Sequence, residues 1–398
     1  MKKSKEIQLL RVGTLFSGIG AFEQALLQMK IPHEIVFACD NGERYIKGND
    51  GRVLDKEDVM HFFPGVTGDA LEKNVEELYE KTGKPNNVKK SYEANYGEMG
   101  DRWHTDIRFM DGRKYRGKVD ILVGGSPCQS FSTYGLKRGL EDARGTLFYD
   151  YARMIKEVQP KVFIFENVRG LLMHDKGRTW DVIKGVFDSL KYEIGEPQVL
   201  NAQDYGLPQM RKRLFVVGIK KSLKTGPFRY PEKVELKDKA SDRKYENGSK
   251  GVPIKYYLPE KGYKWVTEIE RSKNKARLNR DVIGCQTAIQ QVNWSGDFRL
   301  EVAKPEHKKP GSGVYVTHYE GPIERLRKEF AGKEVVVRQL MPEECFRLMG
   351  FEDFKVHPDL VGNDKVLYRQ AGNSIAVPVL KALIAEINKQ VFKMEVVK

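Results

Sequence analysis

A cysteine stands in the stretch Gly124–Ser132, directly after the apolar run Val119–Val123. That run predicts a buried strand, which places Cys128 in the loop just past the strand's end, stiffened by Pro127. In open α/β sheets, ligands bind at this carboxyl edge. A thiol at such an edge could serve as a nucleophile, although most cysteines are small buried hydrophobic residues, and the local sequence leaves that alternative open.

A carboxylate follows a second apolar run, Val162–Phe165, at the start of Glu166-Asn167-Val168-Arg169-Gly170. A carboxyl group directly after four apolar residues is poorly solvated, which favours its protonated form. Glu166 is expected at the same sheet edge as Cys128, where it could move a proton. A capping role for Glu166 is the alternative.

Two arginines occur in Gln209–Arg213, between the predicted strands 198–202 and 214–219, which we expect to form a hairpin. Strand alternation predicts that Arg211 and Arg213 lie on one face of an extended segment. Two guanidinium groups beside a catalytic edge would suit an anionic or carbonyl-bearing ligand. A solvated basic edge strand would give the same pattern.

A glycine turn, Ser17–Gly20, lies between a predicted strand over 9–16 and a predicted helix over 21–29. This order is typical of nucleotide-cofactor sites, because glycines let the backbone approach the ligand at a helix N-terminus. Glu23 stands where the dinucleotide fingerprint has its third glycine. The pattern therefore disfavours NAD and FAD and leaves an adenosine-containing cofactor open.

Two aspartates are placed to contact such a cofactor. Asp40 ends the predicted strand 34–39 and could accept hydrogen bonds from ribose hydroxyls, or it could cap a helix. Asp106 could accept from an adenine amino group, or it could lie in a surface turn. Between them, residues 47–90 form a polar segment that we interpret as an insertion, with one predicted helix over 70–81 and no indicated function.

The charge of the chain is concentrated in one region. Of its 398 residues, Lys and Arg outnumber Asp and Glu to give a net charge of +14, and residues 221–280 hold 17 Lys and Arg against 8 Asp and Glu. Prolines and interleaved aromatic residues in this region predict a loop-rich second domain that binds a polyanion such as nucleic acid. A solvated lysine-rich surface is the alternative.

Other patterns narrow the class of protein. The four cysteines form no CxxC pair, which disfavours a zinc site and a disulfide framework. Scattered histidines and the lack of an acidic cluster give no reason to expect a metal. No apolar signal core and no membrane-length apolar run occur, so we expect a cytoplasmic chain with no membrane span.

Taken together, the motifs resemble the bacterial DNA (cytosine-5)-methyltransferases over about two thirds of the chain. Six blocks match in that family's order: Phe16–Gly20, Pro127–Cys128, Glu166–Val168, Gln209–Arg213, Arg338–Gly350 and Gly372–Ser374. The Pro-Cys and Glu-Asn-Val blocks are the most specific of these.

The resemblance implies a reaction and a role for each catalytic residue. Cys128 would add to carbon 6 of cytosine and so activate carbon 5. Glu166, with Asn167 beside it, would hold ring nitrogen 3, and Arg213 would hold the ring carbonyl oxygen. Arg211 would brace the Cys128 loop. The target base would have to leave the duplex by base flipping.

S-adenosyl-L-methionine is the methyl donor that the resemblance implies, with no metal. Its site would be lined by residues from both ends of the chain: Phe16, Ser17, Gly18, Ile19, Gly20, Asp40, Asn41, Asp106, Ile107, Pro127, Leu147, Asn373 and Ser374.

The family fold implies an α/β chain: a Rossmann-like, S-adenosylmethionine-dependent methyltransferase sheet domain plus a smaller, loop-rich target-recognition domain. We expect these over 1–222 and 223–337, with 338–398 returning to the catalytic domain. Thr287-Ala288-Ile289 only approximates the family's recognition motif, so the base-reading residue stays open.

Double-stranded DNA is the expected partner, in a monomeric, nucleoid-associated bacterial enzyme paired with a restriction endonuclease. Three alternatives remain: a tRNA cytosine-5 methyltransferase with the same chemistry, a non-catalytic nucleic-acid-binding relative, and an NAD-dependent oxidoreductase.

Overall fold

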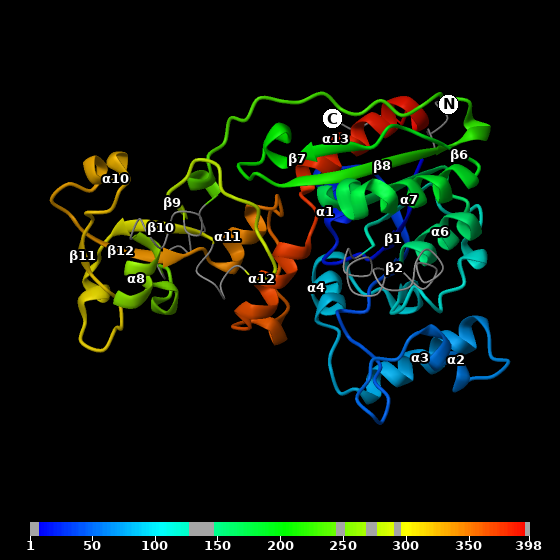
Figure 1. Ribbon diagram of the computed structural model, residues 1–398, viewed down its shortest axis with the longest axis horizontal. Coiled ribbons are helices and arrows are strands. Elements are labelled where there is room, and N and C mark those ends of the chain that lie inside the picture. Colours follow the sequence, from blue (N-terminus) through cyan, green and yellow to red (C-terminus); the bar gives the residue numbers. More distant parts are fainter. Residues whose placement is uncertain (1–7, 127–146, 244–250, 268–276, 290–295, 395–398) are drawn as a thin grey trace, which may run out of the picture. The chain divides into compact units, whose positions relative to one another are not determined.

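The computed structural model describes residues 8–126, 147–243, 251–267, 277–289 and 296–394. Pro127, Cys128 and the rest of the Pro-Cys loop lie outside these residues. The described chain forms two compact units (Figure 1). Unit 1 comprises residues 1–201, 212–233 and 377–398, and unit 2 comprises residues 202–211 and 234–376.

Unit 1 is built on a sheet in the order β3-β2-β1-β4-β5-β8-β6, with β7 also paired to β8. Strands β1 to β5 run parallel, and β8 runs antiparallel to β5. The strands are β1 (Leu10–Leu15), β2 (His33–Cys39), β3 (Trp103–His104), β4 (Ile121–Gly124), β5 (Val162–Val168), β6 (Tyr192–Ile194), β7 (Gln198–Asn201) and β8 (Lys212–Lys220).

The helices of unit 1 are interspersed with these strands along the chain, with α2, α3 and α4 in succession between β2 and β3. They are α1 (Ala21–Gln28), α2 (Lys56–His61), α3 (Gly68–Lys81), α4 (Asn87–Tyr96), α6 (Leu147–Val158), α7 (Arg178–Ser189) and α13 (Val377–Ile387). Alternating strands and helices around a mostly parallel sheet confirm the Rossmann-like α/β prediction. The helix predicted over 70–81 is α3, which begins two residues earlier.

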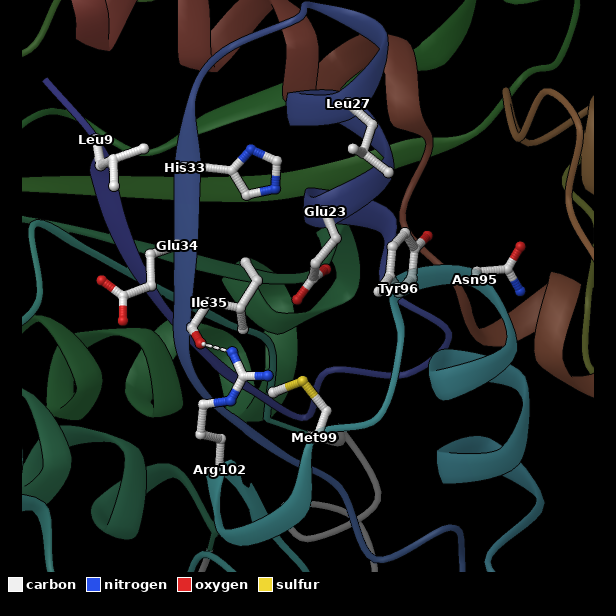
Figure 2. A pocket seen from close by; sticks show the side chains of 10 residues that line it. All are labelled: Leu9, Glu23, Leu27, His33, Glu34, Ile35, Asn95, Tyr96, Met99 and Arg102. Carbon is white, nitrogen blue, oxygen red and sulfur yellow. Dashed lines mark hydrogen bonds between the residues drawn. The ribbon is translucent and has the colours of Figure 1, made fainter. Parts of the chain in front are cut away.

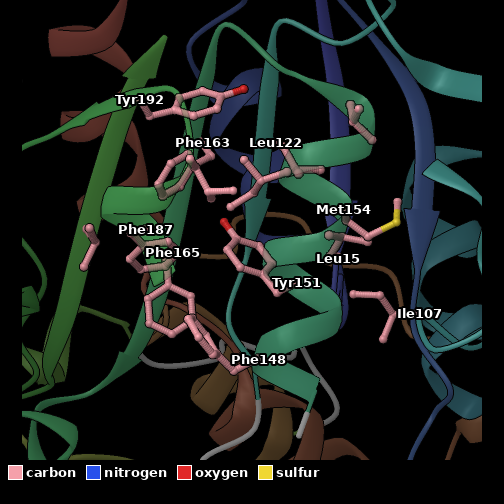
Figure 3. Packing of buried hydrophobic residues seen from close by; sticks show 14 of the residues in the cluster. Leu15, Ile107, Leu122, Phe148, Tyr151, Met154, Phe163, Phe165, Phe187 and Tyr192 are labelled. Atoms are coloured by element: carbon pink, nitrogen blue, oxygen red, sulfur yellow. The ribbon is translucent and has the colours of Figure 1, made fainter. Parts of the chain in front are cut away.

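An aromatic cluster fills the space between α6, α7 and one face of the sheet (Figure 3). Phe148 and Tyr151 of α6 and Phe187 of α7 pack with Phe163 and Phe165 of β5. The residues that alternate with these along the central strands are also buried. Both faces of the sheet are therefore covered, which is why its strands read as continuous apolar runs.

The strand order reverses between β1 and β4, which lie side by side although β2 and β3 come between them in the chain. Such a switch point opens a crevice at the carboxyl ends of the two strands. The turn Phe16–Gly20 follows β1, and Gly125–Ser126 leads from β4 into the Pro-Cys loop. The fold thus brings the Phe16–Gly20 turn and residues Gly125 and Ser126 to the same edge of the sheet.

Unit 2 contains a smaller sheet in the order β11-β12-β10-β9. Its elements are α8 (Glu260–Thr267), β9 (Arg277–Leu278), β10 (Asp297–Val302), β11 (Thr317–His318), α10 (Glu324–Glu329), β12 (Glu334–Gln339), α11 (Pro342–Arg347) and α12 (Asp364–Asn373). Its apolar core includes Phe298 and Leu300 of β10 and Val335 and Val337 of β12.

The two units differ from the expected domains at both ends of unit 2. Strand β12 continues across the expected boundary at 337/338 and pairs with β10, so residues 338–376 are compact with 234–337. Of the segment 338–398 that was expected to return to the catalytic domain, residues 377–398 belong to unit 1, where α13 packs against α1. Residues 223–233 also belong to unit 1. The assignment of a target-recognition role to 223–337 remains a prediction.

Candidate active site

Glu166 and Arg213 form the centre of the candidate site, on neighbouring antiparallel strands of unit 1. The β5–β8 register pairs Val168 with Arg213 and Glu166 with Phe215. The Arg213 Nε lies 3.3 Å from Glu166 Oε1, and both side chains are largely buried, with 18% and 14% of their surfaces exposed. Partly desolvated charges interact more strongly than surface pairs, so the guanidinium holds the carboxyl group in a defined position.

The stem of the Pro-Cys loop lies against this carboxyl group. A side chain at Gly125 would place its Cβ 2.7 Å from Glu166 Oε2 and 2.8 Å from the Glu166 carbonyl oxygen. The amide of Asn167 donates to the carbonyl oxygen of Ser126 at 2.9 Å, and both residues are buried. The Glu-Asn pair thus fixes the two residues that precede Pro127 and Cys128. The positions of Pro127 and Cys128 lie outside the described residues.

Arg211 has different partners from Arg213. It is buried in unit 2, where its guanidinium donates to the carbonyl oxygens of Gln286, Gly372 and Ser374 at 2.9, 2.9 and 2.6 Å. The sequence predicted both arginines on one face of a strand, but β8 begins only at Lys212. In the described residues Arg211 braces the backbone of the Gly372–Ser374 block. Its predicted contact with the Cys128 loop stays untested.

The turn after β1 has the backbone geometry expected of a ligand-binding loop. Phe16, Gly18 and Gly20 have φ angles of 53°, 55° and 80°, in the left-handed region. At Gly20 a side chain would also meet the ring of Tyr96, 2.1 Å from its Cβ position, while the Tyr96 hydroxyl donates to the Gly20 carbonyl oxygen at 2.7 Å. Glycine is required at position 20, because it adopts a left-handed φ angle without strain and has no Cβ to clash with the Tyr96 ring. Ile19 is buried beside it.

Ser17 ties the turn to the neighbouring strand. Its Oγ accepts from the Cys39 amide at 2.9 Å and lies 2.8 Å from the hydroxyl of Thr14. These hydrogen bonds of Ser17, a predicted cofactor residue, join the turn to β1 and β2.

Asp40 is fixed at the end of β2. Its carboxylate accepts from the Gly18 and Gly42 amides at 2.9 and 2.8 Å. Burial raises the pKa of Asp40, and these two N–H groups offset part of that effect. Its neighbour Asn41 closes the following turn by donating to the Arg44 carbonyl oxygen at 3.0 Å. Since each carboxylate oxygen has two lone pairs, Asp40 retains acceptor capacity for a ligand.

Asp106 is held by two side chains. The guanidinium of Arg108 donates to it at 2.7 to 3.1 Å, and the Tyr79 hydroxyl donates to Oδ2 at 2.8 Å. Burial alone would raise the pKa of Asp106, but the charge and hydrogen bonds of Arg108 outweigh it and the pKa is lowered. Asp106 is therefore an ionised, fixed acceptor. Ile107 beside it is buried.

The remaining predicted cofactor residues lie at element ends. Leu147 begins α6 and packs against the aromatic cluster. Asn373 ends α12 in unit 2 and is exposed, and Ser374 caps that helix and is buried. Because the two units are described separately, the geometry of unit 1 alone does not include these last two residues.

The sequence singles out Glu23 only as a departure from the dinucleotide fingerprint, but its carboxyl group is buried in unit 1. Its Oε1 accepts from the hydroxyls of Thr14 and Tyr92 at 3.0 and 2.7 Å, and it is 1% exposed. Burial raises the pKa of Glu23 despite these hydrogen bonds. The sequence feature that could have indicated this buried carboxyl group is its position, since Glu23 replaces the third glycine of the dinucleotide fingerprint.

Glu23 also lines a surface hollow of about 510 Å³ with Leu27, Ile35 and Tyr96 (Figure 2). Leu9 and His33 at its rim stand where β1 and β2 begin. None of the described residues predicted to bind the cofactor lines this hollow, so it is not the predicted cofactor site.

A Glu23→Gln variant is expected to remain folded and to unfold at a higher temperature than the parent protein at neutral and alkaline pH. The folded-state pKa of Glu23 is raised, so its favourable contribution is complete below its unfolded pKa of about 4.3 and is lost as pH rises through the folded value. Glutamine keeps both acceptor contacts and does not ionise. Thermal unfolding between pH 5 and 9 measures the difference, and a gap that shrinks with rising pH would contradict this account.

No helix among the described residues is long and apolar enough to cross a membrane. Within the same residues, no three His, Cys, Asp or Glu side chains gather as they would around a metal ion.

Comparison with known proteins identifies the family of the chain. A family model for the C-5 cytosine-specific DNA methylases matches residues 65–389. The type II methyltransferase M.HpaII of Haemophilus parainfluenzae is 35% identical over 299 residues, covering 74% of this chain and 78% of the relative. M.HhaI of Haemophilus parahaemolyticus is 32% identical over 299 residues, covering 74% and 83%.

Solved structures resemble the whole chain in fold. The Entamoeba histolytica methyltransferase EhMeth has a TM-score of 0.62 at 15% identity, covering 96% of this chain and 98% of that one. The S. pombe Dnmt2 methyltransferase has a TM-score of 0.61 at 18% identity, with the same coverage. At these identities the likeness is one of fold alone.

The mostly parallel sheet with its flanking helices has the fold of the methyltransferases EhMeth and Dnmt2. The chain belongs to the C-5 cytosine-specific DNA methylase family. It is an enzyme of DNA cytosine-5 methylation, which confirms the function predicted from the motifs.

Proposed function

We propose that this methyltransferase uses S-adenosylmethionine to methylate a flipped-out cytosine in a specific duplex sequence, through a covalent adduct with Cys128. The observation that carries the proposal is the Glu166–Arg213 pair, in which Glu166 lies against Gly125, while the neighbouring Asn167 binds Ser126. A nucleophile, a proton-carrying group and a cation that binds a carbonyl oxygen are the parts that this reaction needs.

The polar groups of unit 1 fit the proposed methyl donor. Asp40 ends β2 with acceptor capacity left for ribose hydroxyls, and Asp106 is an ionised acceptor beside β3. The left-handed turn leaves open space at Gly18, where a Cβ would meet no atom within 4 Å, so a ligand can approach the backbone there. When bound there, S-adenosylmethionine supplies an electrophilic methyl group.

The residues of the chain would then act in sequence on the base. Cys128 forms a bond from its sulfur to carbon 6, and the displaced electron pair makes carbon 5 nucleophilic. Glu166 binds ring nitrogen 3 and Arg213 binds the ring carbonyl oxygen, which stabilises the charge that the addition creates. Once carbon 5 carries the methyl group, its proton would pass to water. The electron pair left behind would restore the double bond between carbons 5 and 6, and the carbon–sulfur bond would break to return Cys128 as the thiolate.

The remaining proposals concern partners. Duplex DNA fits the excess of Lys and Arg in residues 221–280, most of which we expect to contact phosphates. The similarity to type II methyltransferases supports pairing with a restriction endonuclease in a bacterial cytoplasm, in association with the nucleoid. We propose that the chain acts as a monomer.

Methyl-labelled S-adenosylmethionine tests the proposed function. The full chain is incubated with mixed-sequence duplex DNA or with bulk tRNA, and a Cys128→Ser variant is the control for the covalent step. Label is expected in DNA alone, and the variant is expected to incorporate none. Label only in tRNA would keep the chemistry and overturn the substrate, whereas DNA binding without label in either would favour a non-catalytic protein.

A further inference from the structure

Residues 47–90, which the sequence marks as an insertion without a function, contact both aspartates of the proposed cofactor site. The contacts come from α3 and from Asn86, the residue that caps the N-terminus of α4. All of these residues belong to unit 1.

The first contact is to Asp40. The side-chain amide of Asn86 donates to the main-chain carbonyl oxygen of Asp40 at 2.9 Å, while its Oδ1 accepts from the Lys89 amide at 2.9 Å. Asn86 is 8% exposed. One buried side chain thus caps α4 and at the same time fixes the backbone from which the Asp40 carboxylate projects.

The second contact is to Asp106. The hydroxyl of Tyr79, which is completely buried, donates to Asp106 Oδ2 at 2.8 Å. Arg108 also binds this carboxylate but is only two residues away, so Tyr79 is the group that ties Asp106 to a distant part of the chain.

Two further side chains on the same face of α3 strengthen the attachment. Glu72 binds the ring of the buried His104 in β3, and Glu76 lies 3.6 Å from the guanidinium of Arg44, just after Asp40. Residues 72, 76 and 79 are spaced by four and three positions, which places them on one helical face. The amide of Asp40 in turn donates to the His104 carbonyl oxygen at 3.0 Å.

We propose that the insertion is a working part of the S-adenosylmethionine site, in which Asn86 and Tyr79 are positioning residues for Asp40 and Asp106. The inference rests on the proposed function, since it assumes that these two carboxylates bind the ribose and the adenine. The hydrogen bonds from Asn86 and Tyr79 hold the two carboxylates in place before the cofactor binds. Removing either hydrogen bond lets a carboxylate move and so lowers the affinity for the cofactor.

Two conservative variants test the proposal. Asn86→Ser keeps a good N-cap residue but is too short to reach Asp40, and Tyr79→Phe removes only the hydroxyl. Each is expected to raise the dissociation constant of S-adenosylhomocysteine, measured by calorimetry, by about 3–10-fold. The KM for S-adenosylmethionine should rise by a similar factor, with kcat at saturation within about twofold of the parent value.

Matched controls separate positioning from general damage. Asn95→Ser removes an amide that donates to the Ser91 carbonyl oxygen within α4, and Tyr192→Phe removes a buried hydroxyl that donates to the Pro160 carbonyl oxygen. Neither is expected to change S-adenosylhomocysteine affinity, even where it lowers the melting temperature.

Unchanged or tighter binding by both variants, or a loss of kcat without a change in affinity, would overturn the inference alone. If the parent protein bound neither S-adenosylmethionine nor S-adenosylhomocysteine, the proposed function itself would fail.

Discussion

Replacing Glu166 by glutamine is expected to lower the rate of methyl transfer by about 10²–10⁴-fold, the range typical for loss of a positioned acid–base group. Glutamine has nearly the same shape, so the contact with Arg213 Nε, now 3.3 Å from a carboxylate oxygen, can persist through the amide oxygen. The amide cannot exchange a proton with ring nitrogen 3. The loss should therefore appear in the chemical step and not in folding.

The measurement is a single-turnover methylation rate with saturating DNA and S-adenosylmethionine, together with the affinity for S-adenosylhomocysteine. Glu193→Gln is the matched control, because Glu193 lies in β6 of the same sheet and pairs with Ile219, away from the motif loops. Its rate should stay close to that of the parent. A Glu166→Gln enzyme that methylates DNA within threefold of the parent rate would remove Glu166 from the proposed chemistry.

An Arg213→Met replacement removes the other member of the Glu166–Arg213 pair. Arg213 contacts the Glu166 carboxyl group and is proposed to bind the ring carbonyl oxygen. The rate reductions caused by replacing Arg213 and by replacing Glu166 should therefore not be additive. The double variant is expected to be about as slow as the slower single variant. Full additivity would mean that the two residues act independently.

The sheet was predictable from sequence because its strands are buried on both faces and read as apolar runs. The positions of Glu166 and Asp40 at strand ends followed from those runs and from the rule that parallel strands expose their carboxyl ends at one edge. One detail differs, since β5 extends through Val168 and Glu166 therefore lies within the strand.

The pairing of Glu166 with Arg213 could not be read from local sequence. It depends on the antiparallel register of β5 and β8, which is a tertiary property. The same limit explains Arg211, whose partners are carbonyl groups about 75 and 160 residues further along the chain. Alternation along a strand fixes which side a residue faces, but it does not say where the strand begins.

The proposed role of residues 47–90 also could not be predicted from local sequence, because it depends on contacts between residues far apart in the chain. Asn86 and Tyr79 contact residues 46 and 27 positions away, and neither stands in a motif. Their residue types suit a helix cap and an apolar helix face, so local patterns explain them fully. Only the folded chain shows that they also bind the two aspartates.

Breaking the buried ion pair between Arg338 and Glu344 is expected to cause the largest loss of stability. Both side chains are almost completely inaccessible, at 2% and 0% exposure, and the guanidinium donates to the two carboxylate oxygens at 2.7 and 2.9 Å. Arg338 Nε also donates to Glu301 at 3.0 Å, and the Met341 amide donates to Glu344 at 2.8 Å. The pair thus joins β12 to the start of α11 within unit 2.

A Glu344→Ala variant should lose about 3–5 kcal/mol of unfolding free energy, because among the described residues it leaves the buried Arg338 guanidinium with Glu301 as its remaining anionic partner. Burial would raise the pKa of Glu344, but the hydrogen bonds and charge of Arg338 outweigh it and the pKa is lowered. The pair's contribution is therefore present above the unfolded pKa of about 4.3 and is lost as pH falls through the folded value. Urea unfolding at pH 7 measures the difference.

Two comparisons separate the buried charge from the contact itself. Glu324→Ala removes an ion pair with Lys328 whose side chains are 69% and 77% exposed, and it should cost at most about 1 kcal/mol. The double replacement Arg338→Met with Glu344→Leu removes both charges of the pair and should recover part of the stability that Glu344→Ala loses, because the Arg338 guanidinium is no longer buried without Glu344. The buried Arg299, whose Nε lies 4.0 Å from Glu344 Oε1, loses that carboxylate in both variants, so its contribution cancels in the comparison. If the double variant were as unstable as Glu344→Ala, the loss would come from packing and not from the unpaired guanidinium.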